Sequence, residues 1–241
     1  MLAWKKRQFK ESAKLGPLRK APSARTVLLD AARHEPYSYL NDHSINHAMR
    51  TKDFEPDEVA DAAMQVFWRR GYAATSVQDL VDGTGLGRGS LYNAFGSKQG
   101  LYEAALRRYH ELTAANLDLL ARPGNARERI GRLLDFIADD ELREPSRRGC
   151  LVANASLEMA GQDEMVAELV RRNFQRLEKA LEQILAEGQA NGEIDAGRSP
   201  RALARFIVTT VQGLRVVSKG STARERRQWL GDVISVALGT I

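Results

Sequence analysis

Cysteine is nearly absent from this sequence, since Cys150 is the only one among 241 residues. A single thiol cannot form an internal disulfide, and it leaves too few sulfur ligands for a structural zinc site. Histidine is equally scarce after residue 49, where His110 stands alone. We therefore expect no disulfide and no metal site.

Long hydrophobic runs are also missing. Near the C-terminus the longest stretches without a charged residue, such as 206–214, have nine residues, which is far too short to span a bilayer. The basic segment 1–20 has no apolar core of the kind that a signal peptide needs. The expected location is the cytoplasm, with no membrane partner.

Residues that carry enzymatic chemistry form no recognisable set. The sequence shows no paired nucleophile and base, no cluster of metal ligands and no phosphate-binding loop. The glycine cluster at 85–89 lacks the preceding strand that a dinucleotide-binding loop requires. An enzyme is therefore not expected, and no cofactor is predicted.

What the sequence does contain is an uneven distribution of charge. Residues 1–48 hold nine Lys or Arg against four Asp or Glu, which accounts for the whole net charge of +5. The remainder carries 27 charges of each sign, and this neutrality disfavours a non-specific architectural DNA-binding protein. Within 64–110, however, six basic residues face three acidic ones, and this local excess suits contact with DNA phosphates.

Helical periodicity dominates after residue 54, and the alternation typical of strands is absent. We therefore expect an all-α fold. The predicted helices cover 56–70, 76–84, 88–95, 98–122, 126–142, 150–160, 164–190, 200–219 and 223–238. Gly71 is placed to end the first helix, and Ser76 and Thr222 begin capping boxes. The order of a supporting helix, two short helices around a Gly-containing turn and a long helix predicts a helix-turn-helix.

Residues 59–106 closely resemble the DNA-binding domain of the tetracycline-repressor (TetR) family. The resemblance is carried by Phe67, Gly71-Tyr72, Thr75-Ser76 and the run 87–92, followed by Phe95, Ser97 and Lys98. It implies a helix-turn-helix DNA-binding domain over 54–110, joined by a long helix to a C-terminal helical ligand-binding and dimerisation domain over 111–241.

The candidate DNA-binding residues lie on the second short helix and on either side of it. The resemblance places DNA contacts at Arg88, Gly89, Ser90, Tyr92, Asn93 and Lys98, and we add Thr75 and Ser76. Arg and Asn side chains can read guanine and adenine edges in the major groove. Phosphate contact is expected for the Tyr, Lys and Thr residues. Alternatively, the Thr and Ser act only as helix caps, the Tyr only packs, and the charged residues are ordinary solvated side chains.

The resemblance further implies a pocket for an unknown small-molecule effector among the central helices. Candidate pocket residues are Tyr109, Asn116, Phe136, Cys150, Asn154, Met159 and Phe174. Each has core packing or simple surface exposure as its alternative. Cys150 is also a candidate sensor of oxidants or electrophiles, because it begins a predicted helix where a thiolate is favoured. The competing interpretation is a small buried apolar residue.

Two late helices carry apolar stripes, which the resemblance implies pair with a second copy as a four-helix bundle. The predicted interface residues are Leu203, Ile207, Val211, Leu214, Trp229, Val233 and Val236. The alternative is that these stripes pack within the chain. A homodimer is favoured because one short recognition helix rarely suffices, whereas a two-fold dimer reads a palindrome.

The expected function is therefore a transcriptional regulator, a ligand-responsive repressor that binds a palindromic operator on double-stranded DNA as a homodimer. An activator and a ligand-independent regulator are the alternatives within the same class.

Residues 1–48 are expected to be a disordered extension. One hypothesis is a misassigned start, with the native protein beginning near Met49. The other is a basic arm that reaches a neighbouring DNA groove.

Overall fold

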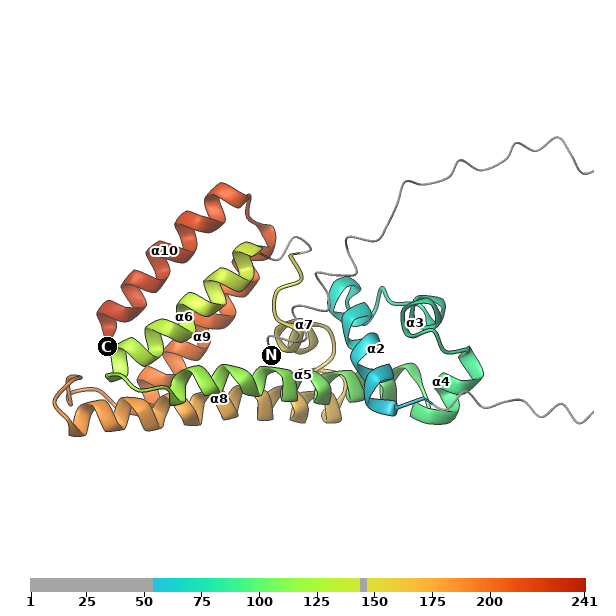
Figure 1. Cartoon of the computed structure of the whole chain (residues 1–241), viewed down its shortest axis with the longest axis horizontal. Coiled ribbons are helices and arrows are strands. Elements are labelled where there is room, and N and C mark those ends of the chain that lie inside the picture. The colour runs from blue at the N-terminus through green and yellow to red at the C-terminus, as the bar shows by residue number, and fades with distance from the viewer. Residues whose placement is uncertain (1–53, 144–146) are drawn as a thin grey trace, which may run out of the picture. The chain divides into compact units, whose positions relative to one another are not determined.

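The computed structural model describes residues 54–143 and 147–241, and every regular element in that part of the chain is a helix (Figure 1). The helices are α2 (Pro56–Arg70), α3 (Val77–Thr84), α4 (Arg88–Phe95), α5 (Lys98–Ala121), α6 (Ala126–Arg143), α7 (Leu151–Glu158), α8 (Glu164–Ala190), α9 (Pro200–Gly220) and α10 (Ala223–Thr240). The prediction of an all-α fold is confirmed. The predictions for residues 1–48 lie outside the described residues.

Most helix ends lie where the sequence predicts them. Helices α2, α4 and α8 have the predicted bounds, and α6, α9 and α10 extend one or two residues further. Ser76 and Thr222 both complete the predicted capping boxes. Helix α7 is shorter than predicted, because Cys150 takes the N-cap position and Met159 already leaves the helix.

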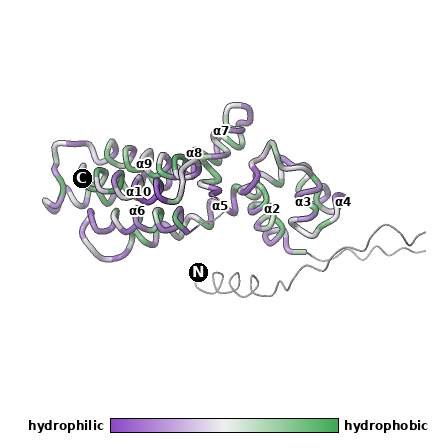
Figure 2. Tube along the Cα trace, turned by 90° about the horizontal axis from the view of Figure 1, so that it is seen from above, coloured by the Kyte–Doolittle hydropathy of each residue, from purple (hydrophilic) through white to green (hydrophobic). Residues whose placement is uncertain are grey.

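The buried side chains form two hydrophobic clusters. The first cluster joins α2, α3, α4 and the first half of α5 to α7 and the start of α8. The second lies between the end of α5, α6, the second half of α8, α9 and α10. Helices α5 and α8 run side by side and contribute to both clusters (Figure 1). Apolar and polar residues alternate along these helices (Figure 2), as expected of helices that bury one face.

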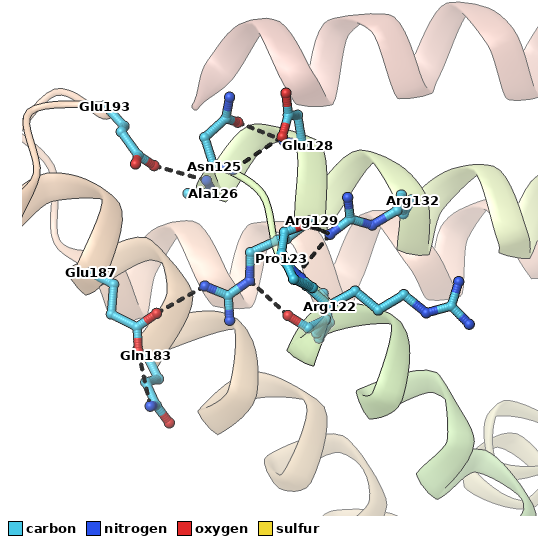
Figure 3. A network of polar contacts seen from close by, with 11 residues as sticks. Arg122, Pro123, Asn125, Ala126, Glu128, Arg129, Arg132, Gln183, Glu187 and Glu193 are labelled. Atoms are coloured by element: carbon cyan, nitrogen blue, oxygen red, sulfur yellow. Dashed lines mark hydrogen bonds and ion pairs between the residues drawn. The ribbon is translucent and has the colours of Figure 1, made fainter.

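The turn between α5 and α6 is held by polar contacts to neighbouring helices (Figure 3). Arg129 donates through Nε to the Leu120 carbonyl at 2.7 Å and through Nη1 to Glu187 at 2.9 Å. Glu193, which follows α8, accepts from the Ala126 amide at 2.9 Å. It thereby satisfies one of the free N–H groups at the start of α6. These contacts attach the end of α8 to the start of α6.

Helices α2 and α3 approach closely at Gly83, where a Cβ atom would lie 2.3 Å from Val66 Cγ2. Val66 belongs to the first cluster and has little room to move. We expect Gly83→Ala to lower the free energy of unfolding by about 1–3 kcal/mol, the usual cost of overpacking. Denaturant unfolding measures this change.

Gly231→Ala is the matched control for that substitution. Gly231 is exposed in α10, and an added Cβ would meet nothing within 4 Å. Alanine there should raise the free energy of unfolding by about 0.5–1 kcal/mol through its better helix propensity. A Gly83→Ala protein as stable as the wild type would contradict the close approach of the two helices.

No helix in the described part of the chain combines the length and the apolar character needed to cross a bilayer.

Candidate nucleic-acid interface and central cavity

Helix α4 is held from one side and is open on the other. Gly85 makes the turn before it with a left-handed φ of 71°. Leu91 anchors α4 in the first cluster, with 4% of its surface exposed. The exposed residues on the opposite side are Arg88, Gly89, Ser90 and Asn93, all of them predicted DNA contacts. This face is free to enter a major groove.

Two of the predicted contact residues lie against aromatic rings. The Arg88 guanidinium carbon is 5.6 Å from the centroid of the Tyr92 ring, and Lys98 Nζ is 4.3 Å from that of Tyr72. Burial lowers the pKa of Lys98, and the nearby Glu158 carboxylate opposes this shift. Each cation is therefore oriented by a cation–π contact at the edge of the helix-turn-helix.

The prediction that the Thr75 side chain contacts phosphate is wrong for this structure. Only 1% of Thr75 is exposed, and its hydroxyl donates to the Gly71 carbonyl at 2.6 Å. The hydroxyl therefore fixes the loop between α2 and α3. Ser76 is exposed and caps α3, accepting from the Asp79 amide at 3.1 Å. The capping interpretation therefore holds for Ser76, whereas Thr75 stabilises the loop and caps no helix.

A cavity of about 40 Å³ lies between α5, α6, α8, α9 and the start of α7. It has room for a few water molecules, since a single water needs roughly 10–15 Å³ on this measure. The described residues that line it are Tyr109, Thr113, Asn116, Leu117, Ile137, Cys150, Asn173, Arg176, Leu177, Val211, Gln212 and Arg215. Three of the predicted pocket residues, Tyr109, Asn116 and Cys150, are among them.

The other four predicted pocket residues do not line this cavity. Phe136 packs against the second cluster, and Met159 and Phe174 pack against the first. Asn154 donates to the Arg148 carbonyl at 3.1 Å and so holds the segment before α7. Core packing, the alternative interpretation, accounts for the three apolar side chains, whereas Asn154 makes a loop contact that the sequence did not predict.

Buried polar side chains form one wall of the cavity. Tyr109 donates its hydroxyl to Cys150 Sγ at 3.5 Å, and burial raises the pKa of Tyr109 well above its usual value. Arg215 is 6% exposed and pairs with buried Glu141 at 3.0 Å. Cys150 is itself only 6% exposed, and this burial favours the packing interpretation over the sensor interpretation.

The segment around α7 connects the cavity wall to α2. Trp68 of α2 donates through Nε1 to the Gly149 carbonyl at 2.9 Å, directly before Cys150. The Trp68 ring also packs edge-on against Tyr109, with 4.9 Å between centroids. At the other end of α7, Glu158 accepts from the Tyr72 amide at 2.7 Å. One end of α7 is thus tied to α2 and the other to the loop that follows α2, and only the first of these ends lies at the cavity.

The predicted dimer stripe on α9 is wrong. Leu203, Ile207, Val211 and Leu214 are at most 5% exposed and belong to the second cluster. They pack within the chain and offer no surface to a second copy. On α10, Trp229 and Val236 are 49% and 67% exposed, as an interface residue should be, and Val233 is half-buried.

The sequence reasoning missed the other face of α9, where Phe206 and Val216 are 41% and 51% exposed. It also missed the polar cavity residues Thr113, Asn173, Arg176, Gln212 and Arg215. One signal was available: Gln212 and Arg215 each follow a buried apolar residue of α9 directly, and polar side chains at such positions need an internal partner.

Known proteins resemble the chain over both halves. Residues 59–105 match the family of bacterial regulatory proteins of the tetR type, and residues 126–229 match the tetracyclin repressor-like C-terminal domain. The HTH-type transcriptional repressor ComR of Escherichia coli (strain K12) is 30% identical over 179 residues, covering 73% of this chain and 85% of ComR. The HTH-type transcriptional regulator YezE of Bacillus subtilis (strain 168) is 30% identical over 195 residues, covering 80% and 98%.

Solved structures agree with the sequence relatives. A cysteine mutant of the TetR family transcriptional regulator CifR, complexed with 26-bp double-strand operator DNA, has a TM-score of 0.69 and 31% identity. That match covers 79% of this chain and 98% of the CifR chain. The resemblance seen in the sequence is confirmed, and the chain belongs to the tetR family of bacterial regulatory proteins.

Proposed function

We propose that the protein is a transcriptional repressor that binds a palindromic operator as a homodimer and releases it when a small molecule occupies the central cavity. The observation that carries the DNA-binding part is the open face of α4, where Arg88, Ser90 and Asn93 project beside the small Gly89. Hydrogen-bonding side chains on a helix narrow enough for the major groove are what direct base readout requires. The repressor names of several relatives support the same assignment.

Selection of bound sequences from a random DNA pool tests this proposal. The expected result is an enriched sequence with two-fold symmetry, because a symmetric dimer reads two equivalent half-sites. Recovery of DNA without any enriched sequence would contradict sequence-specific regulation. An enriched but asymmetric sequence would contradict the two-fold homodimer.

The exposed faces of α9 and α10 support the homodimer. Phe206, Gly213 and Val216 share one face of α9, while Trp229 and Val236 share one face of α10. An added Cβ at Gly213 would meet nothing within 4 Å inside the chain, so its small size serves no packing there. Large exposed apolar side chains on two adjacent helices are typical of a protein interface. Two copies would close this surface as a four-helix bundle.

The contacts of α7 support the regulatory part. A molecule that enters the cavity meets Tyr109 and Cys150, and the adjacent Gly149 carbonyl holds Trp68 of α2. Displacement at the cavity wall is therefore passed to the helix that supports α3 and α4. Release of the operator requires that the effector binds the DNA-incompetent arrangement more tightly than the competent one.

Lys98→Ala provides a separate test of phosphate contact. Lys98 sits at the first position of α5, where the free amide groups of the helix also attract an anion. We expect the variant to bind all DNA sequences more weakly and to lower the salt slope by about one per half-site. Binding isotherms at several salt concentrations measure both effects. A loss confined to the selected operator would contradict the phosphate role.

A further inference from the structure

The wall of the central cavity is rich in polar and cationic groups. Arg176 and Arg215 enter it from α8 and α9, and three amide side chains lie beside them, those of Asn116, Asn173 and Gln212. Among the described residues that line the cavity, none is an Asp or a Glu. The charge of the lining itself is therefore positive, and the question is which of the two cations is already neutralised.

Arg215 has its negative partners within the protein. Its Nη1 atom lies 3.0 Å from Glu141 Oε1 and 3.4 Å from Asp140 Oδ2. The Glu141 side chain is buried with it, so this ion pair is internal and compensated. Arg215 needs no further anion.

Arg176 differs, because its contacts are all neutral. Its Nη2 atom donates to the His110 carbonyl at 2.7 Å and to Thr113 Oγ1 at 2.8 Å. It forms no ion pair with any residue that the structure describes. The side chain is half-buried, and burial lowers the pKa of its guanidinium, although an arginine remains charged. One positive charge therefore stands at the cavity uncompensated.

The remaining polar groups are also available for a guest molecule. Asn116 is half-buried, and its amide makes no side-chain hydrogen bond within the described part of the chain. The Gln212 amide makes no hydrogen bond among the described residues: its oxygen is buried without a partner, and its NH₂ group can donate to a guest. Buried polar atoms of this kind are costly unless they are satisfied, so the cavity favours a polar guest over a purely apolar one.

We propose that the cavity binds a small monocarboxylate, held by Arg176 and by the amide of Asn116. This inference rests on the proposed function and names the chemical class of its effector. The planar guanidinium matches the two oxygens of a carboxylate. A single uncompensated cation suits one negative charge, whereas a doubly charged phosphate would leave a buried excess. Leu117, Ile137 and Leu177 give a short apolar chain its packing surface.

Thermal unfolding with defined probes tests the site. The probes are sodium acetate, propanoate and butanoate, each compared with its primary amide at constant ionic strength. The full-length protein is expected to gain thermal stability with at least one carboxylate and not with the matching amide, since a ligand stabilises the state that it binds. Titration of that carboxylate then gives its affinity.

Two variants and a control identify the residues. Arg176→Gln is expected to weaken carboxylate binding at least about tenfold, through loss of the charge-assisted pair. Arg171→Gln is the control, because Arg171 is exposed on the same helix and pairs with Glu164 and Glu168. Asn116→Leu removes a donor that makes no internal hydrogen bond, so it tests the same site if Arg176→Gln fails to fold.

Equal stabilisation by carboxylates and amides, or equal carboxylate affinity in Arg176→Gln and the wild type, would overturn the proposal. If Arg176→Gln does not fold, unchanged affinity in Asn116→Leu would overturn it. Operator release separates this outcome from failure of the proposed function. A protein that binds its selected operator and releases it only to uncharged compounds is still a regulator but has no carboxylate site. A protein that selects no operator loses the regulator assignment, while thermal unfolding still decides the site.

Discussion

Arg88→Ala is expected to abolish discrimination between the selected operator and random DNA. Arg88 is exposed at the first position of α4 and lies against the Tyr92 ring. Loss of one bidentate base contact costs about 1–3 kcal/mol per half-site. A dimer loses it twice, which amounts to roughly 30-fold to 20,000-fold weaker operator binding. Fluorescence anisotropy with operator and random duplexes measures the change.

Arg171→Ala serves as the control for that experiment, since it removes the same charge from α8, far along the chain from α4. Helicity and dimerisation should be unchanged in both variants, because Arg88 has no contact in the hydrophobic clusters. If Arg88→Ala discriminated between the two duplexes as well as the wild type does, Arg88 would not be a base-reading residue.

Val216→Glu is expected to dissociate the dimer without unfolding the chain. Val216 is 51% exposed in a single copy, so a glutamate there is tolerated by the monomer. In the proposed dimer the new carboxylate would be buried without a partner, twice per interface. We expect the dimer dissociation constant to rise at least about a hundredfold, which is roughly 2.7 kcal/mol. Sedimentation measures the association and circular dichroism the helicity.

Val211→Glu, on the same helix, is expected to unfold the chain rather than only dissociate the dimer. Val211 is 2% exposed in the second cluster, so this variant should lose its helical fold together with its association. A Val216→Glu protein that remains dimeric with full helicity would place the interface elsewhere. Folded, dimeric Val211→Glu would contradict the position of α9 in the core.

The fold was largely predictable because its signals are local. Gly71 and the capping boxes at Ser76 and Thr222 determine helix ends through contacts within a few residues. The face of α9 was not predictable in the same way. The helix is apolar on two sides, with Leu203 and Ile207 on one and Phe206 and Val216 on the other. Which of these two sides is buried depends on how α6, α8 and α10 pack against α9. The periodicity of the sequence does not distinguish between the two sides.

The candidate site shows the same division between local and distant causes. The exposed face of α4 follows from the positions of Leu91 and Arg88 within one short helix. The cavity, in contrast, is assembled from four helices and the N-cap residue of α7, and its polar residues are far apart in sequence. Arg176 becomes informative only when its contacts on α5 are known to be neutral. Whether a charged side chain has an ion-pair partner on a distant helix cannot be predicted from the spacing of residues in the sequence.

The shared first cluster limits how the protein can be divided. Val152 and Ala155 of α7 are buried in the same cluster as Phe67 and Leu101. About fifty residues of sequence separate the start of α5 from the start of α7. A fragment that ends near residue 110 would expose this surface to water and lose the bond from Trp68 to Gly149. The helix-turn-helix domain over 54–110 is therefore not expected to fold as an independent unit. A chimera that exchanges residues 54–110 with those of a relative would also have to exchange residues 147–170, because both halves of that packing must be inherited together.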